Sequence, residues 1–122
     1  MKYSIFVTGK AKQDLIEAAD YIEYTLLNPK AADDLIDRFE KEINNLAFMP
    51  EKHQLVNDPV LAAWGIRMIA LNNYIVFYTV DKESKSISVI RFLYGKRNWI
   101  SVLSNDTVTP DWTVGLKLKY EK

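Results

Sequence analysis

The segment NYIVFYTVDKESKSISVIRFLYGKRNW, residues 73–99, decides the fold of this chain. Its first part predicts a strand that begins at Tyr74, because aromatic and β-branched residues recur there at every second position. The polar run DKESKS predicts a turn, and a second strand returns through Leu93. Arg91 interrupts the apolar series of this returning strand. We therefore expect it either to lie at an edge of the sheet or to have a functional role. The end of this strand is therefore the first place to look for a site.

Two amphipathic helices are predicted upstream of these strands. From about Lys10 to Leu27, apolar residues recur every three or four positions, and acidic residues between them predict a solvent-facing side. Asn28 followed by Pro29 predicts the end of this helix and the start of a second, which runs to about Phe48. So short a connection makes the pair an antiparallel helical hairpin. The predicted apolar face consists of Ala11, Leu15, Ala18, Ile22 and Leu26, and the acidic face of Asp14, Glu17, Asp20 and Glu23.

The remaining elements are shorter. We expect a strand over residues 3–7, a loop with one helical turn over 51–64, a strand over 65–71 and a tight turn at Asn72-Asn73. A short helix is expected over 98–103. The order predicts an α+β fold, in which a helical hairpin packs on a small, mostly antiparallel sheet with the order β-α-α-β-β-β. If the first strand lies beside the last, that pair is parallel.

The domain is expected to span residues 1–103, with a C-terminal extension over 104–122. This extension is polar and contains Pro110 and Gly115, but its apolar residues alternate at the end. Such alternation is typical of an edge strand, or of a segment that docks on a partner. The alternating residues are Val114, Leu116, Leu118 and Tyr120.

Composition limits the classes of function. The chain has 122 residues, is 48% hydrophobic, and carries 16 basic and 16 acidic residues, which suits one globular domain with zero formal charge. Nucleic-acid binding would therefore have to depend on a local patch of cations. The absence of cysteine excludes disulfides and thiol chemistry. The short apolar run at the start is too brief for a signal peptide or membrane span, so we expect a cytoplasmic protein without membrane association.

The strongest candidate site is a group of cations around the end of the last strand. Neighbouring strands are expected to bring Arg67 near Arg91, Lys96 and Arg97, with Tyr94 beside them. Such a group can hold a phosphate through forked, charge-assisted hydrogen bonds. The alternative, equally open from the residues, is that these cations are solvated and that Arg91 pairs with a carboxylate of a helix.

Tyr94 and Trp99 lie close to these cations and allow two interpretations. Their rings could stack on bases of single-stranded RNA, or they could cover the end of the core. We favour the second, because the tryptophans and tyrosines are spread along the chain and form no stacking platform. His53, the single histidine, lies in a predicted polar loop without further ligand residues at suitable spacing. We therefore expect no metal site and no cofactor.

Two stretches, GIRMIALNNYIVFYTVD at 65–81 and SISVIRFLYGKRNWISVL at 86–103, resemble the RelE/ParE superfamily of bacterial type II toxins. The resemblance extends from Tyr3 to about Leu103 and includes the helical hairpin. It implies a toxin that a cognate antitoxin holds inactive. The expected assembly is a homodimer of the toxin or a hetero-oligomer of toxin and antitoxin. Members either bind and poison DNA gyrase, as ParE does, or cut messenger RNA in the ribosome, as RelE does. A third outcome is an inert member of the superfamily.

The resemblance also implies roles for single residues. If the chain is a nuclease, Arg97 matches an arginine of the RelE-type cleavage site, and Arg67 and Tyr94 would complete the catalytic group. However, Ile75 stands where cleaving members often carry an arginine, and Leu103 stands near the position of a tyrosine that assists cleavage. Gyrase inhibition by binding is therefore the preferred expectation. Residues expected to contact the antitoxin or the target are Arg67, Arg91, Tyr94, Lys96, Arg97 and Trp99.

Overall fold

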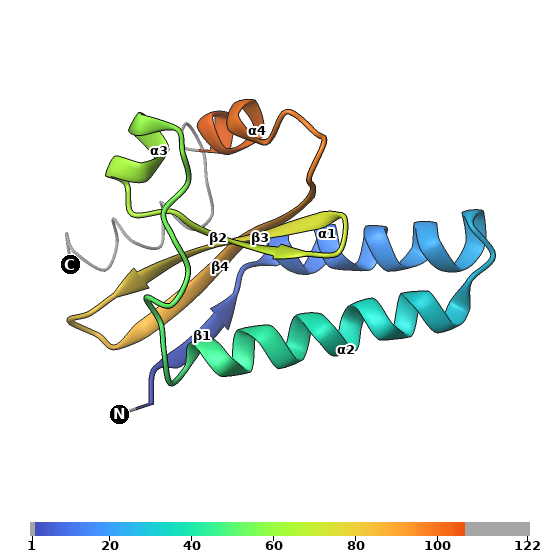
Figure 1. Ribbon diagram of the computed structural model, residues 1–122, viewed down its shortest axis with the longest axis horizontal. Helices are drawn as coiled ribbons and strands as arrows, with labels where there is room; N and C mark the ends of the chain where they lie inside the picture. The colour runs from blue at the N-terminus through green and yellow to red at the C-terminus, as the bar shows by residue number, and fades with distance from the viewer. Residues whose placement is uncertain (1, 107–122) are drawn as a thin grey trace.

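A four-stranded sheet is the centre of the computed structural model, which describes residues 2–106 (Figure 1). The strands are β1 (Ser4–Val7), β2 (Arg67–Leu71), β3 (Tyr74–Asp81) and β4 (Ser86–Tyr94). Their order is β1–β4–β3–β2, with β2, β3 and β4 antiparallel and β1 parallel to β4. The predicted α+β class is confirmed, and so is the parallel pairing of the first strand with the last.

The helical hairpin covers one face of this sheet (Figure 1). It consists of α1 (Gly9–Asp20), a π-helical turn η1 (Tyr21–Thr25) and α2 (Pro29–Leu46). Thr8 caps α1, because its hydroxyl oxygen accepts a hydrogen bond from the Ala11 amide. Asn28 caps α2 in the same way, with Pro29 in the first turn as predicted.

The first helix ends differently from the prediction, which continued a regular α-helix to Leu27. In η1 the Leu26 amide donates to the carbonyl of Tyr21, five residues back, at 3.0 Å. A π turn is wider than an α turn and rotates the residues that follow it around the axis. As a result Leu26, predicted on the buried face, is 55% exposed. Leu27 then adopts φ 54°, a left-handed conformation that closes the hairpin.

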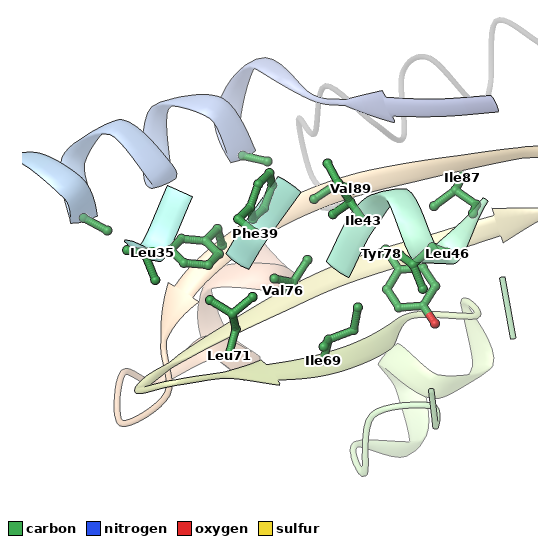
Figure 2. Close-up of a cluster of buried hydrophobic side chains, with 13 residues drawn as sticks. Leu35, Phe39, Ile43, Leu46, Ile69, Leu71, Val76, Tyr78, Ile87 and Val89 are labelled. Atoms are coloured by element: carbon green, nitrogen blue, oxygen red, sulfur yellow. The ribbon is translucent and has the colours of Figure 1, made fainter. Parts of the chain in front are cut away.

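The main core lies between the hairpin and the sheet (Figure 2). The α2 side chains Leu35, Phe39 and Ile43 point onto β3 and β4, where Val76 and Tyr78 are fully buried. Phe39 meets Phe92 edge to face, with the ring centroids 5.5 Å apart. The three-to-four-residue spacing along α2 therefore places its apolar stripe on the alternating inner face of the sheet.

A second, smaller core covers the other face of the sheet beneath α3 (Pro59–Ala63) and α4 (Trp99–Asp106) (Figure 1). The single helical turn predicted in the loop is α3. The terminal helix runs three residues beyond Leu103, where both the helix and the domain were predicted to end. The alternating segment of residues 114–120 lies outside the described residues. The buried members of this core are Val56, Leu61, Ile66, Phe77, Ile90, Leu93 and Leu103.

Tyr78 links the main core to the loop after α2. Its hydroxyl donates to the carbonyl of Pro50 at 3.0 Å, and burial raises its pKa above the ordinary value of 10.0. Because the folded state holds this proton more tightly than the unfolded state, stability is complete below about pH 10 and falls as the pH rises further. We expect Tyr78→Phe to lower the free energy of unfolding at pH 7 by about 1–2 kcal/mol, because the Pro50 carbonyl loses its hydrogen-bond donor.

Urea denaturation at several pH values measures both effects. The Tyr78→Phe protein should lose less stability between pH 9 and pH 11 than the parent chain. An equal loss in the two proteins would show that the Tyr78 hydroxyl does not contribute to the alkaline decline.

Candidate functional site

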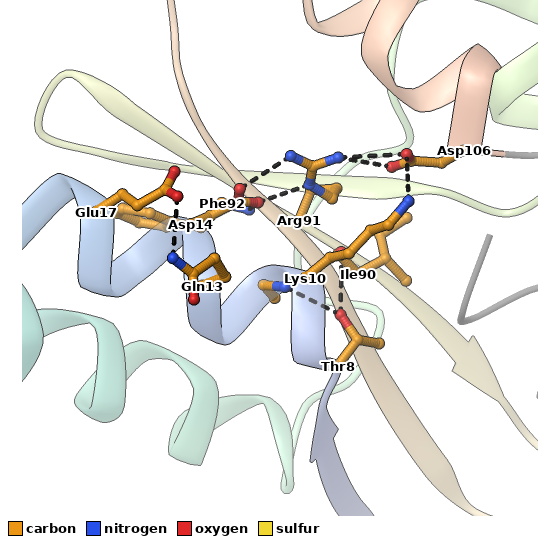
Figure 3. A network of polar contacts seen from close by, with 10 residues as sticks. Thr8, Lys10, Gln13, Asp14, Glu17, Ile90, Arg91, Phe92 and Asp106 are labelled. Carbon is orange, nitrogen blue, oxygen red and sulfur yellow. Dashed lines mark hydrogen bonds and ion pairs between the residues drawn. The ribbon is translucent and has the colours of Figure 1, made fainter. Parts of the chain in front are cut away.

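Arg91 is the cation that interrupts the apolar series of β4, and it forms an ion-pair cluster with Lys10, Asp14 and Asp106 (Figure 3). Its Nε and Nη2 donate to the two carboxylate oxygens of Asp14 at 2.6 and 2.9 Å. Its Nη1 donates to Asp106 at 3.0 Å, and Lys10 donates to the same carboxylate at 3.1 Å. The forked pairing matches the planar guanidinium to a carboxylate. The cluster therefore joins α1, β4 and α4.

Burial makes this cluster structural. The Arg91 side chain is 12% exposed, and the hydrogen bond to Asp14 raises its pKa further above an already high value. Asp14 also accepts a hydrogen bond from the backbone amide of Phe92 at 3.1 Å. The pairing of β1 with β4 ends at Val89, so the edge of β4 beyond that residue has no strand partner among the described residues. The Asp14 carboxylate bonds to the Phe92 amide on this part of the edge. The prediction that Asp14 lies on the solvent face is wrong.

The structure brings Arg91 to α1 by a bulge in β4. Phe77 lies opposite Arg91, whereas the next residue, Tyr78, lies opposite Val89, so Ile90 is an extra residue. A bulge bends its strand and redirects the neighbouring side chains. Arg91 is thereby directed to its two carboxylates and away from a ligand site. The sequence allowed Arg91 either to bind a ligand or to pair with a helix carboxylate, and the structure shows the second.

Arg67 lies far from the end of β4, contrary to the prediction. It pairs with Tyr78, whereas Tyr94 pairs with Tyr74, which in turn lies opposite Leu71. Arg67 is thus four residues, about 13 Å, from the strand end where Tyr94 lies. Its guanidinium donates to the carbonyl of His53 at 2.7 Å and to Glu51 at 3.3 Å. The predicted convergence of Arg67 with the other cations is wrong, because the strand register sets it apart.

Lys96 and Arg97 remain together at the end of β4. We use the term turn rim for Asn72, Asn73, Tyr94, Gly95, Lys96 and Arg97, which form two adjacent loops at this end of the sheet. The Gly95 amide donates to the carbonyl of Asn73 at 2.7 Å, and a Cβ on Gly95 would lie 3.2 Å from the same oxygen. Glycine therefore allows the two loops to approach closely. Within residues 2–106, the exposed side chains of Lys96 and Arg97 have no carboxylate partner.

Tyr94 is the aromatic side chain of the turn rim. It is 43% exposed and contacts Tyr74 edge to face, with the ring centroids 5.8 Å apart. A groove of about 980 Å³ runs from Tyr94 to the tip of the hairpin, and a smaller one of about 230 Å³ lies beside Lys96. The large groove is lined by residues of η1, α2 and the β2–β3 turn, among them Tyr21, Ile22, Leu26 and Leu35. An exposed ring beside free cations can bind a partner surface by cation and aromatic contacts.

Trp99 does not belong to the turn rim. Its ring packs on Phe77 with centroids 5.1 Å apart, in the second core. The interpretation of Trp99 as a cover for the core is therefore the one that the structure shows. Ile75 and Leu103 also face this core, and Leu103 is fully buried.

The turn rim carries Tyr94 and Lys96, two side chains of types that can take part in acid–base chemistry. Among residues 2–106, no histidine or carboxylate bonds to the side chains of Tyr94, Lys96 or Arg97. His53 lies in the loop before β2, and its backbone carbonyl binds Arg67. Partial burial lowers the pKa of its imidazole from the ordinary value of 6.5. The described residues contain no cluster of side chains that could hold a metal ion, and none of their helices is long and apolar enough to cross a membrane.

Comparison with known proteins identifies the family. The family model described as the ParE toxin of the type II toxin–antitoxin system parDE matches residues 5–99. The chain belongs to this toxin family. The matched residues include the hairpin, the sheet from Ile5 onward and the turn rim. No curated protein matches the sequence.

Solved structures of other toxins share the fold. A chain of the RelBE2 toxin–antitoxin complex from Mycobacterium tuberculosis is 17% identical, with a TM-score of 0.54 over 77% of this chain and 99% of its own. A chain of the chromosomal ParDE system from P. aeruginosa is 20% identical, with a TM-score of 0.61 over 76% and 96%. Free E. coli RelE, as a double arginine-to-alanine variant, is 16% identical, with a TM-score of 0.57 over 84% and 93%. At these identities the likeness shows the fold and leaves the target open.

Sequence reasoning missed the partners of the buried cations. Asp14, Asp106 and Lys10 were not assigned to the site, although one signal was present. Asp14 is three residues after Ala11 and four before Ala18, so it lies on the buried stripe of α1. A carboxylate at such a position needs a cation from another element.

Proposed function

We propose that this toxin arrests growth by binding DNA gyrase, without cleaving a substrate itself. The observation that supports this is the turn rim, where Lys96 and Arg97 are exposed and free of partners among the described residues, while Tyr94 has no acid–base partner. A surface of this kind can bind an acidic protein patch. The apolar Ile75 and Leu103, at positions where the resemblance expects cleavage residues, support binding over catalysis.

Rigidity of the turn rim favours a binding role. Tyr74 stacks on Phe92 with centroids 4.9 Å apart, and Asn72 accepts a hydrogen bond from Arg38 of α2. Both contacts fix the turn to the core before any partner arrives. A preformed surface loses less conformational entropy on association.

The toxin also has a cognate antitoxin that holds it inactive in a hetero-oligomer. Two of the similar structures come from a toxin–antitoxin complex and a toxin–antitoxin system, which supports such a partner. The surface offered to an acidic antitoxin segment is the turn rim, because Arg67 and Arg91 are already neutralised within this chain. Co-purification of the toxin with the product of its neighbouring gene tests this partnership.

Supercoiling by purified gyrase provides the test of the target. The full chain should inhibit the reaction. The Arg97→Ala variant should need at least about tenfold more protein for the same inhibition, because a charge-assisted hydrogen bond contributes about 1.5–3 kcal/mol to binding. Lys82→Ala is the matched control, since Lys82 is an exposed cation on the opposite turn of the same sheet. It should inhibit like the parent.

Two other results would replace this proposal. Codon-spaced cuts on translating ribosomes, seen by primer extension and lost in Arg97→Ala, would make the toxin a messenger RNA endonuclease. Normal growth when the chain is expressed without an antitoxin would make it an inert member of the family.

A further inference from the structure

The outer edge of β1 is a strand edge without a partner among the described residues. Ser4 and Thr8 donate their amide hydrogens to the carbonyls of Lys85 and Val89 in β4, at 2.9 and 3.0 Å. Because successive amides of a strand point to opposite sides, those of Ile5 and Val7 point away from β4. Within residues 2–106, no group accepts from them. Unpaired groups of this kind form a template for another strand.

Space and apolar surface accompany this edge. A groove of about 430 Å³ runs beside it, between Tyr3, Ile5 and the end of α2. Phe48 borders the groove and is 66% exposed, and Phe6 of β1 is 60% exposed. The first part of the edge is already occupied, because the Tyr3 amide donates to the carbonyl of Ala47 at 2.8 Å. The open part therefore begins at Ile5 and ends at Val7.

We propose that residues 113–120 of this same chain, TVGLKLKY, pair with the outer edge of β1 as a fifth strand. Apolar side chains alternate with polar ones along this segment, as expected for a strand with one covered and one open face. Lysine at every second position is a usual feature of edge strands, because it prevents further pairing. The apolar residues are Val114, Leu116, Leu118 and Tyr120, and the lysines are Lys117 and Lys119.

The place where the chain leaves the described fold fits this occupant. Asp106 is fixed to Lys10 at 3.1 Å, and Lys10 is three residues beyond the end of β1. In the proposed pairing, the segment would start at the Val7 end of the edge and run back towards Ser4, antiparallel to β1. Residues 107–112 can extend about 20 Å, which exceeds the distance of about 10 Å covered by the three residues after Val7. A short connection of this kind favours pairing within one chain over pairing with another.

Hydrogen exchange measured by NMR on the full chain tests the pairing at single amides. The amides of Ile5 and Val7 should exchange at least tenfold faster in Leu116→Asn/Leu118→Asn than in the parent chain. Those of Ser4 and Thr8, which bond to β4, should be unchanged and serve as internal references. The control Lys117→Asn/Lys119→Asn alters the other face of the segment and should keep Ile5 and Val7 protected. Equal exchange of Ile5 and Val7 in the parent and in the Leu116→Asn/Leu118→Asn protein would overturn the proposal.

A spin label locates the segment independently of its stability. The chain has no cysteine, so Lys117→Cys gives a single attachment site on the polar face. The label should broaden the amide signals of Ile5 and Val7 more than those of Ile69 and Leu71 in β2. Stronger broadening in β2 would place the segment on the other edge of the sheet and overturn the proposal.

A mixture of spin-labelled chain with isotope-labelled, unmodified chain separates pairing within one molecule from pairing between copies. Broadening of Ile5 in this mixture would assign the edge to a second copy and would also overturn the proposal. None of these measurements involves gyrase or an antitoxin, so their outcome does not depend on the proposed function.

Discussion

Replacement of Arg91 by alanine is expected to lower the free energy of unfolding by about 3–5 kcal/mol, because it removes the guanidinium that pairs with the buried carboxylates of Asp14 and Asp106. Lys10 still contacts Asp106, but among residues 2–106 Asp14 has no other cation. Urea denaturation followed by circular dichroism measures the loss. Domains of this size unfold with a small free energy, so a change of this size clearly lowers the urea concentration at the midpoint of unfolding.

Arg97→Ala is the matched control for Arg91→Ala. Its guanidinium is exposed and unpaired within the described residues, so its removal should change stability by less than about 0.5 kcal/mol. The two substitutions therefore distinguish an arginine that stabilises the fold from a nearby arginine that is proposed to bind a partner. A stability loss below about 1 kcal/mol for Arg91→Ala would show that the ion-pair cluster does not hold α1, β4 and α4 together.

Arg91→Lys tests the geometry of the cluster at constant charge. The guanidinium bonds to both oxygens of Asp14 while a third nitrogen reaches Asp106. An ammonium group is compact and cannot make this planar set of contacts. The lysine variant should therefore be less stable than the parent and more stable than Arg91→Ala.

The second large effect is expected from Phe39→Ala, with a loss of about 3–5 kcal/mol. Phe39 is buried between α2 and the sheet (Figure 2). Its ring meets that of Phe92 edge to face. Its removal leaves a cavity whose lining loses van der Waals contacts. Thermal or urea denaturation gives the change in free energy.

Tyr24→Ala serves as the control for Phe39→Ala, because this aromatic lies on the same hairpin but is mostly exposed. It should cost less than about 1 kcal/mol. Similar losses in both variants would show that the hairpin tip contributes to stability as much as the packed stripe of α2. That result would contradict the assignment of the core.

Part of the candidate site could be predicted from residues alone. The glycine and cations at 95–97 and the turn at Asn72-Asn73 are local features, so their juxtaposition follows from two strands joined by a turn. Arg67 was misplaced because it is the first residue of β2, four residues before the end of that strand, and the turn at Asn72-Asn73 sets the register that places it opposite Tyr78. Trp99 allowed two interpretations because an aromatic next to cations can bind a partner or cover the core, and the cover, which was favoured, is what the structure shows.

The sequence by itself determined the hairpin and the order of the helices and strands along the chain, and its resemblance to known toxins indicated the family. The hairpin and this order follow from caps, periodicity and turn residues, which act over a few neighbouring positions. Only the tertiary structure decided which cations are free. Arg91 and Arg97 are alike as residues, but the bulge at Ile90 directs the first towards Asp14, 77 positions away in sequence, whereas the second stays in solvent. Electrostatic pairing depends on distance in space, and long-range packing sets that distance.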